Sequence, residues 1–403
     1  MAKDYSPFTP GVPVSPDSFA GKATELRQLM DACEAAQSGR FERTFIIGDR
    51  GIGKSSICNF VREAAETRLK MLGVHAFLGG ARTVEEMCRR IFEEIARASR
   101  SKPWYSKLAD TFRHHVKEVG LFGISVSFEA ESSELRSLAS NLPSELDALL
   151  DQLKPERTGM VLILDDINGL SESQEFADWL KSFVDKVGTA HRSLPLHLIL
   201  AGLPERRESL IRLQPSLNRV FTLLPTSLIG HTEATEFFHS QFSRVGIKLE
   251  DAAADVLVRF SGGYPAILHE IGDAAFRLDS DGVIAPPEAY DAVLHAADNV
   301  GRKFLDDQVL NAIKSEKYKE ILKTIVTTSA GPAFSRQDVL SRLGDAEQKI
   351  FSNFISKMKD LGVLAQTQPG RYRFTSALHW LYYIMRFGRY EGRTTIADRP
   401  HEP

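Results

Sequence analysis

The chain has 403 residues, of which 43% are hydrophobic and 26% charged, with a net charge of −3. This length allows two or three domains with ample cores, and the composition is that of an ordinary globular protein. No stretch approaches the roughly 18 apolar residues of a membrane helix, and the N-terminus lacks the apolar segment of a signal peptide. The three cysteines lack metal-ligand spacing. We therefore expect a cytoplasmic protein with reduced thiols and no membrane partner.

The charge is distributed unevenly along the chain. Residues 301–403 carry 17 Lys and Arg against 11 Asp and Glu, whereas the other 300 residues carry 33 against 42. A basic C-terminal segment favours a polyanionic partner, although its net charge of +6 is modest.

Residues 1–18 contain four prolines and little periodicity, so we expect an extended arm. A helix follows and is expected to run to about Gln37. Beyond it, helical segments alternate with apolar runs that predict strands at 43–47, 74–78, 160–165, 196–201 and 219–223. This alternation is typical of a doubly wound parallel sheet.

The first strand runs directly into the phosphate-binding P-loop pattern G-x-x-x-x-G-K-[ST] at residues 48–55. Its glycines permit a tight turn whose N–H groups face phosphates, and the next helix adds its positive dipole end. Lys54 is expected to reach the β- and γ-phosphates, and the Ser55 hydroxyl to hold Mg²⁺. The expected nucleotide contacts are Gly48, Asp49, Arg50, Gly51, Ile52, Gly53, Lys54, Ser55 and Ser56.

Residues 119–129 interrupt the alternation, between helices expected at 104–117 and 134–153. Alternating apolar and polar residues with nearby glycines predict a β-hairpin or a short extra strand. It would be either an edge element of the main sheet or an inserted functional loop.

The apolar run at 160–164 ends in two carboxylates, Asp165 and Asp166. A continuous apolar strand is typical of a parallel sheet that is covered on both faces. Ligands bind at the carboxyl ends of such strands. Asp165 is therefore the candidate for the Mg²⁺ shell, and Asp166 for orienting or deprotonating the attacking water.

The C-terminal part is expected to be helical, with segments at 232–245, 250–260, 264–277 and 287–297 forming a small bundle. Further helices are expected at 314–328, at 334–340 with Ser335 as its N-cap, and at 346–360. Two strands, at 363–366 and 371–374, complete the pattern of a winged helix-turn-helix. The tail after residue 388 is expected to be disordered.

The winged helix has a polar face that predicts contacts with duplex DNA. Lysines and arginines would meet phosphates, and Ser352 and Asn353 would reach base edges. The candidates are Lys349, Ser352, Asn353, Lys357, Lys359, Arg371 and Arg373. A solvated face or a protein-docking role is the alternative.

Phe19-Ala20-Gly21-Lys22, with Glu25 and Leu26, resembles the F-x-G-R-x-x-E-L box of origin-recognition-like and STAND-type AAA+ ATPases. The P-loop, the Asp-Asp pair, a Gly-Gly-Tyr-Pro turn and the winged helix follow in that family's order, over residues 19–388. The resemblance implies an α/β P-loop NTPase with a parallel sheet between helices, a helical lid and a C-terminal winged helix. It divides the chain into an arm (1–18), a nucleotide-binding domain (19–230), a lid (231–300), a winged-helix domain (301–388) and a tail (389–403).

The resemblance also assigns site residues. It implies that the backbone around Phe19, Gly21 and Lys22, together with Tyr264 and Pro265, closes over the adenine of ATP or ADP. Arg219 best matches the arginine finger that a neighbouring subunit supplies, although it would equally suit a surface arginine at a strand edge. Sensor 1 is unassigned, with Arg206 and Arg207 as substitutes, and Arg277 is a weak candidate for sensor 2.

The function that the resemblance implies is an ATP-dependent switch that forms homo-oligomers and engages DNA or an effector protein. It would serve a process such as DNA mobility, replication or anti-phage defence. Hydrolysis is expected to be slow, because Asp166 stands where many AAA+ motors have the longer Glu. The alternative is a STAND-like signalling scaffold with nucleotide-held autoinhibition and no DNA binding.

Overall fold

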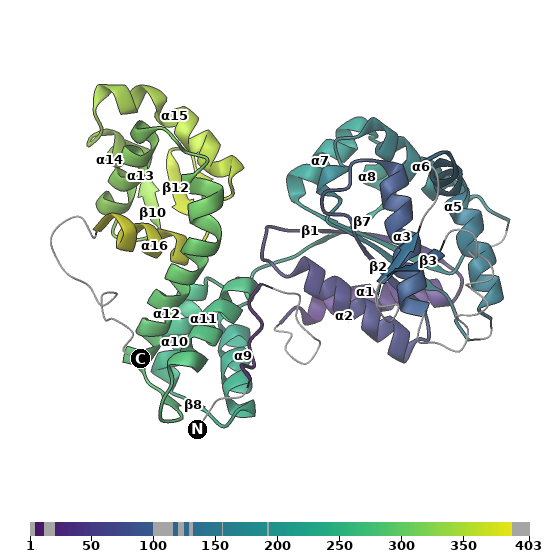
Figure 1. Cartoon of the computed structure of the whole chain (residues 1–403), viewed down its shortest axis with the longest axis horizontal. Helices are drawn as coiled ribbons and strands as arrows, with labels where there is room; N and C mark the ends of the chain where they lie inside the picture. The colour runs from purple at the N-terminus through teal and green to yellow at the C-terminus, as the bar shows by residue number, and fades with distance from the viewer. Residues whose placement is uncertain are drawn as a thin grey trace. The chain divides into compact units, whose positions relative to one another are not determined.

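The computed structural model describes residues 5–11, 21–99, 116–119, 125–128, 132–154, 156–191 and 193–388 (Figure 1). The chain forms two compact units. One consists of Pro13–Ser227, and the other joins Met1–Val12 to Leu228–Pro403. The tail predicted at 389–403 and most of the helix predicted at 104–117 lie outside the described residues.

The first unit is built on a five-stranded sheet in the order β2-β5-β6-β1-β7, with every neighbouring pair parallel. The strands are β1 (Phe41–Ile47), β2 (Leu72–Phe77), β5 (Met160–Asp165), β6 (Leu196–Gly202) and β7 (Thr222–Pro225). Because the strands are parallel, the carboxyl ends of β1 and β5 lie at the same edge, separated only by β6. The predicted α/β fold with a parallel sheet is therefore confirmed.

Helices cover both faces of this sheet (Figure 1). One face packs against α1 (Ala23–Gln37) and α2 (Lys54–Arg68). The other packs against α3 (Val84–Ser99), α5 (Ser132–Gln152) and α6 (Gln174–Gly188). Successive residues of β5 pack on opposite faces of the sheet. Val161 and Ile163 pack in the core on the α1/α2 side, and Leu162 and Leu164 pack in the core on the other side. A strand that is buried on both faces must be apolar throughout, which explains the continuous run before Asp165.

The strand predicted at 219–223 is partly wrong, because Leu217–Val220 form the short helix α8 and β7 begins only at Thr222. The amides of Asn218 and Arg219 donate to the carbonyls of Pro215 and Ser216, which winds this segment into a tight turn. Arg219 therefore lies on a helix that follows α7 (Pro204–Leu213), not at a strand edge.

The hairpin predicted near 119–129 is present, but it is not an edge of the main sheet. Strands β3 (Val116–Val119) and β4 (Ser125–Phe128) pair antiparallel as a separate two-stranded sheet. Residues 116 and 117 consequently belong to a strand, although the pattern predicted the end of a helix there.

The second unit begins with a helical bundle. Its helices are α9 (His231–Arg244), α10 (Asp251–Ser261), α11 (Pro265–Leu278) and α12 (Pro286–Val300), and β8 (Lys248–Leu249) pairs with β9 (Val283–Ile284) beside them. Part of the N-terminal arm packs into this bundle. Phe8 is buried against aromatic rings of α9, and a Cβ at Gly272 would clash with the Phe8 ring. The amide of Thr9 donates to Nδ1 of His269, at 3.1 Å.

The C-terminal elements share a separate core. In chain order they are the π-helical segment η3 (Gly301–Leu310), α13 (Glu316–Thr328), β10 (Ala333–Ser335), α14 (Arg336–Leu340), α15 (Asp345–Asp360), β11 (Leu364–Gln368), β12 (Arg371–Phe374) and α16 (Ala377–Gly388). As predicted, the Ser335 hydroxyl accepts from the Gln337 amide at the start of α14. The two predicted strands are joined by a third, β10, in an antiparallel sheet. None of the described helices is long and apolar enough to cross a membrane.

Candidate functional site

The geometry of the loop between β1 and α2 requires glycine at Gly53 and at Gly48 for two different reasons. Gly53 has φ +95°, a left-handed conformation that places it just before the first turn of α2. Gly48 is required for a different reason, because a Cβ there would clash with the Thr226 hydroxyl. Thr226 is held in place by two hydrogen bonds to the carbonyl of Ile47, at 2.8 Å from its amide and 2.9 Å from its hydroxyl. The loop is thus pinned at both ends.

Lys54 begins α2, and its ammonium group folds back onto the loop. Nζ donates to the carbonyl oxygens of Gly48, at 2.7 Å, and Asp49, at 2.8 Å. Burial lowers the pKa of Lys54, and the carboxylates of Asp165, Asp49 and Asp166 oppose that shift. The lysine and the carboxylates of Asp165 and Asp166 therefore share one electrostatic environment. Ser55 and Ser56 lie half-buried in the first turn of α2, where backbone N–H groups have no partner within the helix.

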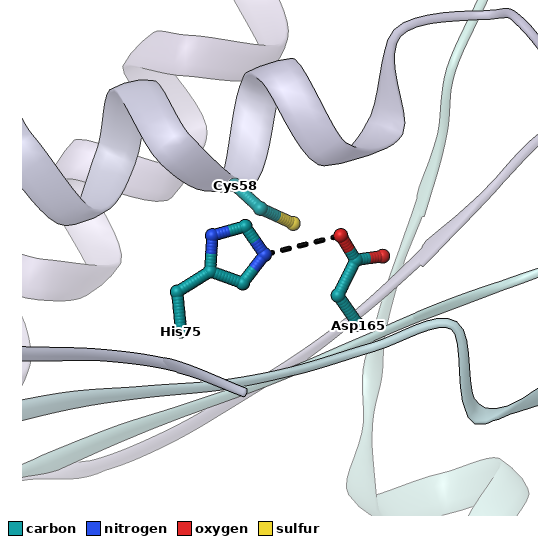
Figure 2. A group of neighbouring side chains, drawn as sticks. All are labelled: Cys58, His75 and Asp165. Carbon is teal, nitrogen blue, oxygen red and sulfur yellow. Dashed lines mark hydrogen bonds and ion pairs between the residues drawn. The ribbon is translucent and has the colours of Figure 1, made fainter. Parts of the chain in front are cut away.

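Asp165 ends β5 and is almost completely buried, at 1% exposure. Its Oδ2 lies 3.1 Å from Nε2 of His75 on β2. Cys58 of α2 is the third member of this group, and the ligand atoms of the three residues lie within 4.8 Å of one another. Figure 2 shows the three side chains pointing toward one another, while the second carboxylate oxygen of Asp165 points away from His75. The sequence pattern did not single out His75 or Cys58, and the only signal was a histidine in an otherwise apolar strand.

Asp166 leaves the strand in a different conformation. Its φ of +57° is left-handed, one of three such non-glycine residues among the described positions. Its Oδ1 accepts from the Asn168 side-chain amide, whose own oxygen accepts from the amide of Leu203, at 3.2 Å. Asn168 therefore connects the end of β5 to the end of β6. It was not predicted, although a polar residue two positions after Asp166 is visible in the sequence.

The comparisons with known proteins identify this part of the chain. Residues 18–213 match the family model of the AAA ATPase domain. These residues form an AAA ATPase domain. The chain is therefore an ATPase. None of the curated proteins compared with the chain matches it.

Solved structures resemble the fold over most of the chain. The Walker-type ATPase of Pyrococcus abyssi matches with a TM-score of 0.53 and 16% identity, covering 92% of this chain and 97% of that protein. The ORC2 protein of Aeropyrum pernix, solved in ADPNP–ADP complexes, matches with a TM-score of 0.54 and 13% identity, covering 96% of this chain and 97% of that one. At these identities the likeness shows the fold of AAA+ ATPases.

Other residues predicted for the site have contacts of their own in the AAA ATPase domain. Lys22 is buried with φ +67°, and its Nζ donates to the Ser227 carbonyl and lies 3.7 Å from Glu25. Its side chain thus joins the start of α1 to the segment after β7. Gly21 precedes it with φ +62°, whereas Phe19 lies outside the described residues.

The predicted arginines divide into paired and exposed ones. Arg206 forms an ion pair with Glu172, and Arg207 donates to Asn218, at 2.6 Å. Arg219 is exposed on α8, in the first unit.

The remaining predicted residues belong to the second unit. Tyr264 and Pro265 start α11, so their contact with adenine stays a prediction. Arg277 pairs with Asp273, 2.8 Å away on the same helix.

All seven candidate DNA contacts have exposed side chains. Phe351, Phe354 and Met358 of α15 point into the core, which leaves the polar positions of this helix facing solvent. In β12 the alternation exposes Arg371 and Arg373 and buries Tyr372 and Phe374.

Arg371 lines a shallow hollow on the surface, which also includes Arg336 and Gln348. Arg336 donates to the Ser352 hydroxyl, at 3.2 Å, and its guanidinium lies over the Phe351 ring. The sequence pattern did not predict Arg336 as part of this face.

Proposed function

We propose that the chain is a molecular switch that binds Mg²⁺-ATP, hydrolyses it slowly, and changes its assembly and its partner contacts with the nucleotide state. The observation that carries this proposal is the meeting of Lys54, Asp165 and Asp166 at one edge of the parallel sheet. Phosphate would bind to the backbone N–H groups of the P-loop and to Lys54. The Ser55 hydroxyl and the Asp165 carboxylate are oxygen ligands of the kind that Mg²⁺ prefers.

Slow hydrolysis follows from the position and length of Asp166. A water molecule attacking the γ-phosphate must lie within hydrogen-bond reach of the group that orients it, about 3 Å. An aspartate is one methylene shorter than glutamate, and Asn168 already holds one of its oxygens. The water therefore has fewer positions in which it can meet both the carboxylate and the phosphate.

Assembly would complete the site, because an arginine finger is delivered from a neighbouring subunit. Arg219 supports this role through its exposure on α8, and it differs from Arg206, whose guanidinium pairs with Glu172. The homo-oligomer proposed here is therefore part of the catalytic mechanism.

The C-terminal elements η3 to α16 are proposed to act as a winged helix that engages duplex DNA. This rests on the net charge of residues 301–403, on the exposed lysines of α15 and the exposed Arg373, and on Arg336 and Arg371 at the hollow beside the strand turn. Guanidinium groups suit phosphate, and α15 would carry the side chains that approach the bases.

One measurement separates this switch from a signalling scaffold. We expect duplex DNA to bind the purified full-length chain at low salt, with an affinity that depends on whether ATP or ADP is present. A chain that retains ADP tightly and has no affinity for DNA at 50 mM salt would instead favour the STAND-like scaffold.

A further inference from the structure

His75 is the hydrogen-bond partner of Asp165 on the neighbouring strand β2. In β2 its neighbours Val74 and Ala76 face the opposite side of the sheet, so the imidazole points toward α2. The residue is 7% exposed, and its ring stacks on Phe77 with centroids 4.4 Å apart and planes at 27°. This stack, together with burial, limits the rotation of the ring. Nε2 is thereby held 3.1 Å from Oδ2 of Asp165.

The direction of this hydrogen bond follows from chemistry. An ionised carboxylate can only accept, so Nε2 of His75 carries the hydrogen and donates it. Asp165 is withdrawn from water at 1% exposure, and a buried carboxylate needs such donors to stay in one orientation. One oxygen is occupied by His75, and the other points away from it (Figure 2).

We propose that His75 is a positioning residue for ATP hydrolysis, which holds the Asp165 carboxylate so that its second oxygen faces the Mg²⁺ shell. The inference rests on the proposed role of Asp165 in holding Mg²⁺. Hydrogen bonds behind a metal-binding carboxylate orient it, and their loss typically lowers metal affinity or activity by about 10- to 100-fold.

An alternative to the hydrogen-bonded arrangement is that Cys58, His75 and Asp165 together bind a thiophilic metal ion such as zinc. Zinc binds cysteine as the thiolate. Burial raises the pKa of the Cys58 thiol well above its usual value, and the Asp165 carboxylate raises it further. The ammonium group of Lys54 opposes this rise in the pKa of Cys58 but does not cancel it, so the thiol keeps its proton. The hydrogen-bonded arrangement is therefore the one that the charges favour.

The test compares His75→Leu, which removes the donor, with His75→Gln, whose amide N–H takes nearly the same place as Nε2–H. For each purified full-length variant, kcat, the KM for ATP and the Mg²⁺ concentration that gives half-maximal rate are measured. We expect His75→Leu to lower kcat and raise the Mg²⁺ requirement, each by about tenfold or more. We expect His75→Gln to restore kcat and the Mg²⁺ requirement to nearly their parental values. The affinity for ATP measured without Mg²⁺ should be the same in the parent, His75→Leu and His75→Gln.

A matched control is His197→Leu. His197 is a fully buried histidine of the neighbouring strand β6, but it contacts Thr44 and Cys33 instead of Asp165. This variant should lose thermal stability while keeping the parental Mg²⁺ requirement. If His197→Leu shifted that requirement as much as His75→Leu does, the effect would be one of general destabilisation and the proposal would be wrong.

Asp165→Asn shows whether a negative result concerns the role of His75 or the role of Asp165. If Asp165→Asn raises the Mg²⁺ requirement but neither His75 variant differs from the parent, only the inference about His75 fails. If Asp165→Asn keeps the parental requirement, the proposed role of Asp165 fails and the inference falls with it.

Elemental analysis of the parent adds an independent check: one zinc ion per chain that is lost in Cys58→Ser would show a metal site and overturn the proposal. Should His75→Leu not fold, His75→Ala takes its place as the variant that lacks the donor, and the same outcomes decide.

Discussion

The ammonium nitrogen of Lys54 lies 2.7 Å from the carbonyl oxygen of Gly48, six residues earlier in the same loop. An ammonium group has three N–H donors, and the carbonyls of Gly48 and Asp49 accept from two of them. The third remains for a phosphate oxygen, which as a charged acceptor makes the stronger bond. The two carbonyl contacts thus fix the position of the lysine in the loop.

Replacing this lysine should abolish ATP binding. Lys54→Ala removes the only point charge that the loop directs at the β- and γ-phosphates, and it leaves the carboxylates of Asp165 and Asp166 near them. Calorimetric titration with Mg²⁺-ATP is the measurement. A Lys54→Ala variant that binds ATP as tightly as the parent would show that the site has been placed wrongly.

Removing the charge of Asp166 should separate binding from turnover. In Asp166→Asn the side chain keeps its size and its place beside Asn168, but it can no longer orient or deprotonate water as a carboxylate does. We expect ATP affinity within about twofold of the parent and a kcat at least about 100-fold lower, as for loss of a general base. Equal turnover in the parent and the variant would exclude Asp166 from the chemical step.

The arginine-finger proposal predicts a dependence on protein concentration. Arg219→Ala should lower turnover by about 10³-fold while nucleotide binding survives. Arg212→Ala, a change of another exposed arginine on the preceding helix, is the matched control and should have little effect. The rate per subunit of the parent should rise from nanomolar to micromolar protein. A rate that stays flat in a chain that sediments as a monomer with ATP would exclude a shared site.

Binding to DNA should depend on charges at one face of the C-terminal elements. We expect Lys357→Glu combined with Arg371→Glu to abolish binding of duplex DNA by the full-length chain. Lys317→Glu combined with Lys323→Glu makes the same change in charge on α13 and should have a much smaller effect. Each lost phosphate contact should reduce the slope of log affinity against log salt by about one. Equal losses in the two double variants would indicate general electrostatics without a defined DNA face.

The attachment of the N-terminal arm should weaken in acid. Burial lowers the pKa of His269 to about 4 from 6.5, so between these values the unfolded chain binds more protons than the folded chain. Stability of the second unit should therefore fall as the pH decreases from about 6.5 toward 4, by at most about 1.4 kcal/mol per pH unit from this group. Protonation of Nδ1 would also remove the acceptor of the Thr9 amide.

The His269→Asn variant tests this pH dependence, because asparagine keeps an acceptor near the position of Nδ1 but does not titrate in this range. Its melting temperature should vary less between pH 6.5 and 4 than that of the parent. His295→Asn, at an exposed position of α12, should behave as the parent does. The idea fails if His269→Asn and His295→Asn give the same pH dependence.

Residues of the proposed nucleotide site could be recognised in the sequence where they are close together, and not where they are far apart. The P-loop and the Asp165–Asp166 pair each carry a local pattern, and the parallel sheet places both at one edge. His75 was missed because its contact with Asp165 depends on β2 lying beside β5, two strands whose contacting residues are 90 positions apart. Periodicity predicts that a strand exists but does not give its neighbour in the sheet.

The errors in the predicted elements arise where backbone hydrogen bonds or contacts with distant segments override the local residue pattern. Arg219 lies in a stretch with strand-like composition, but backbone hydrogen bonds to Pro215 and Ser216 form a short helix first. Strand β10 has three residues, too few for an alternating pattern to be visible, and it exists because β12 offers it a partner. Packing between distant segments, as of Phe8 against α9, likewise has no local signal.

The left-handed backbone of Asp166 bears on attempts to make this ATPase faster. A simple way to imitate rapid AAA+ motors would be Asp166→Glu, which lengthens the side chain by one methylene. Aspartate and asparagine tolerate φ near +57° because their short side chains can hydrogen-bond locally, as Asp166 does with Asn168. Glutamate has no such local partner at the same reach and would strain the turn. The short side chain of Asp166 and its left-handed backbone conformation therefore depend on each other. A faster enzyme would require a new conformation of the whole turn at residues 166–168.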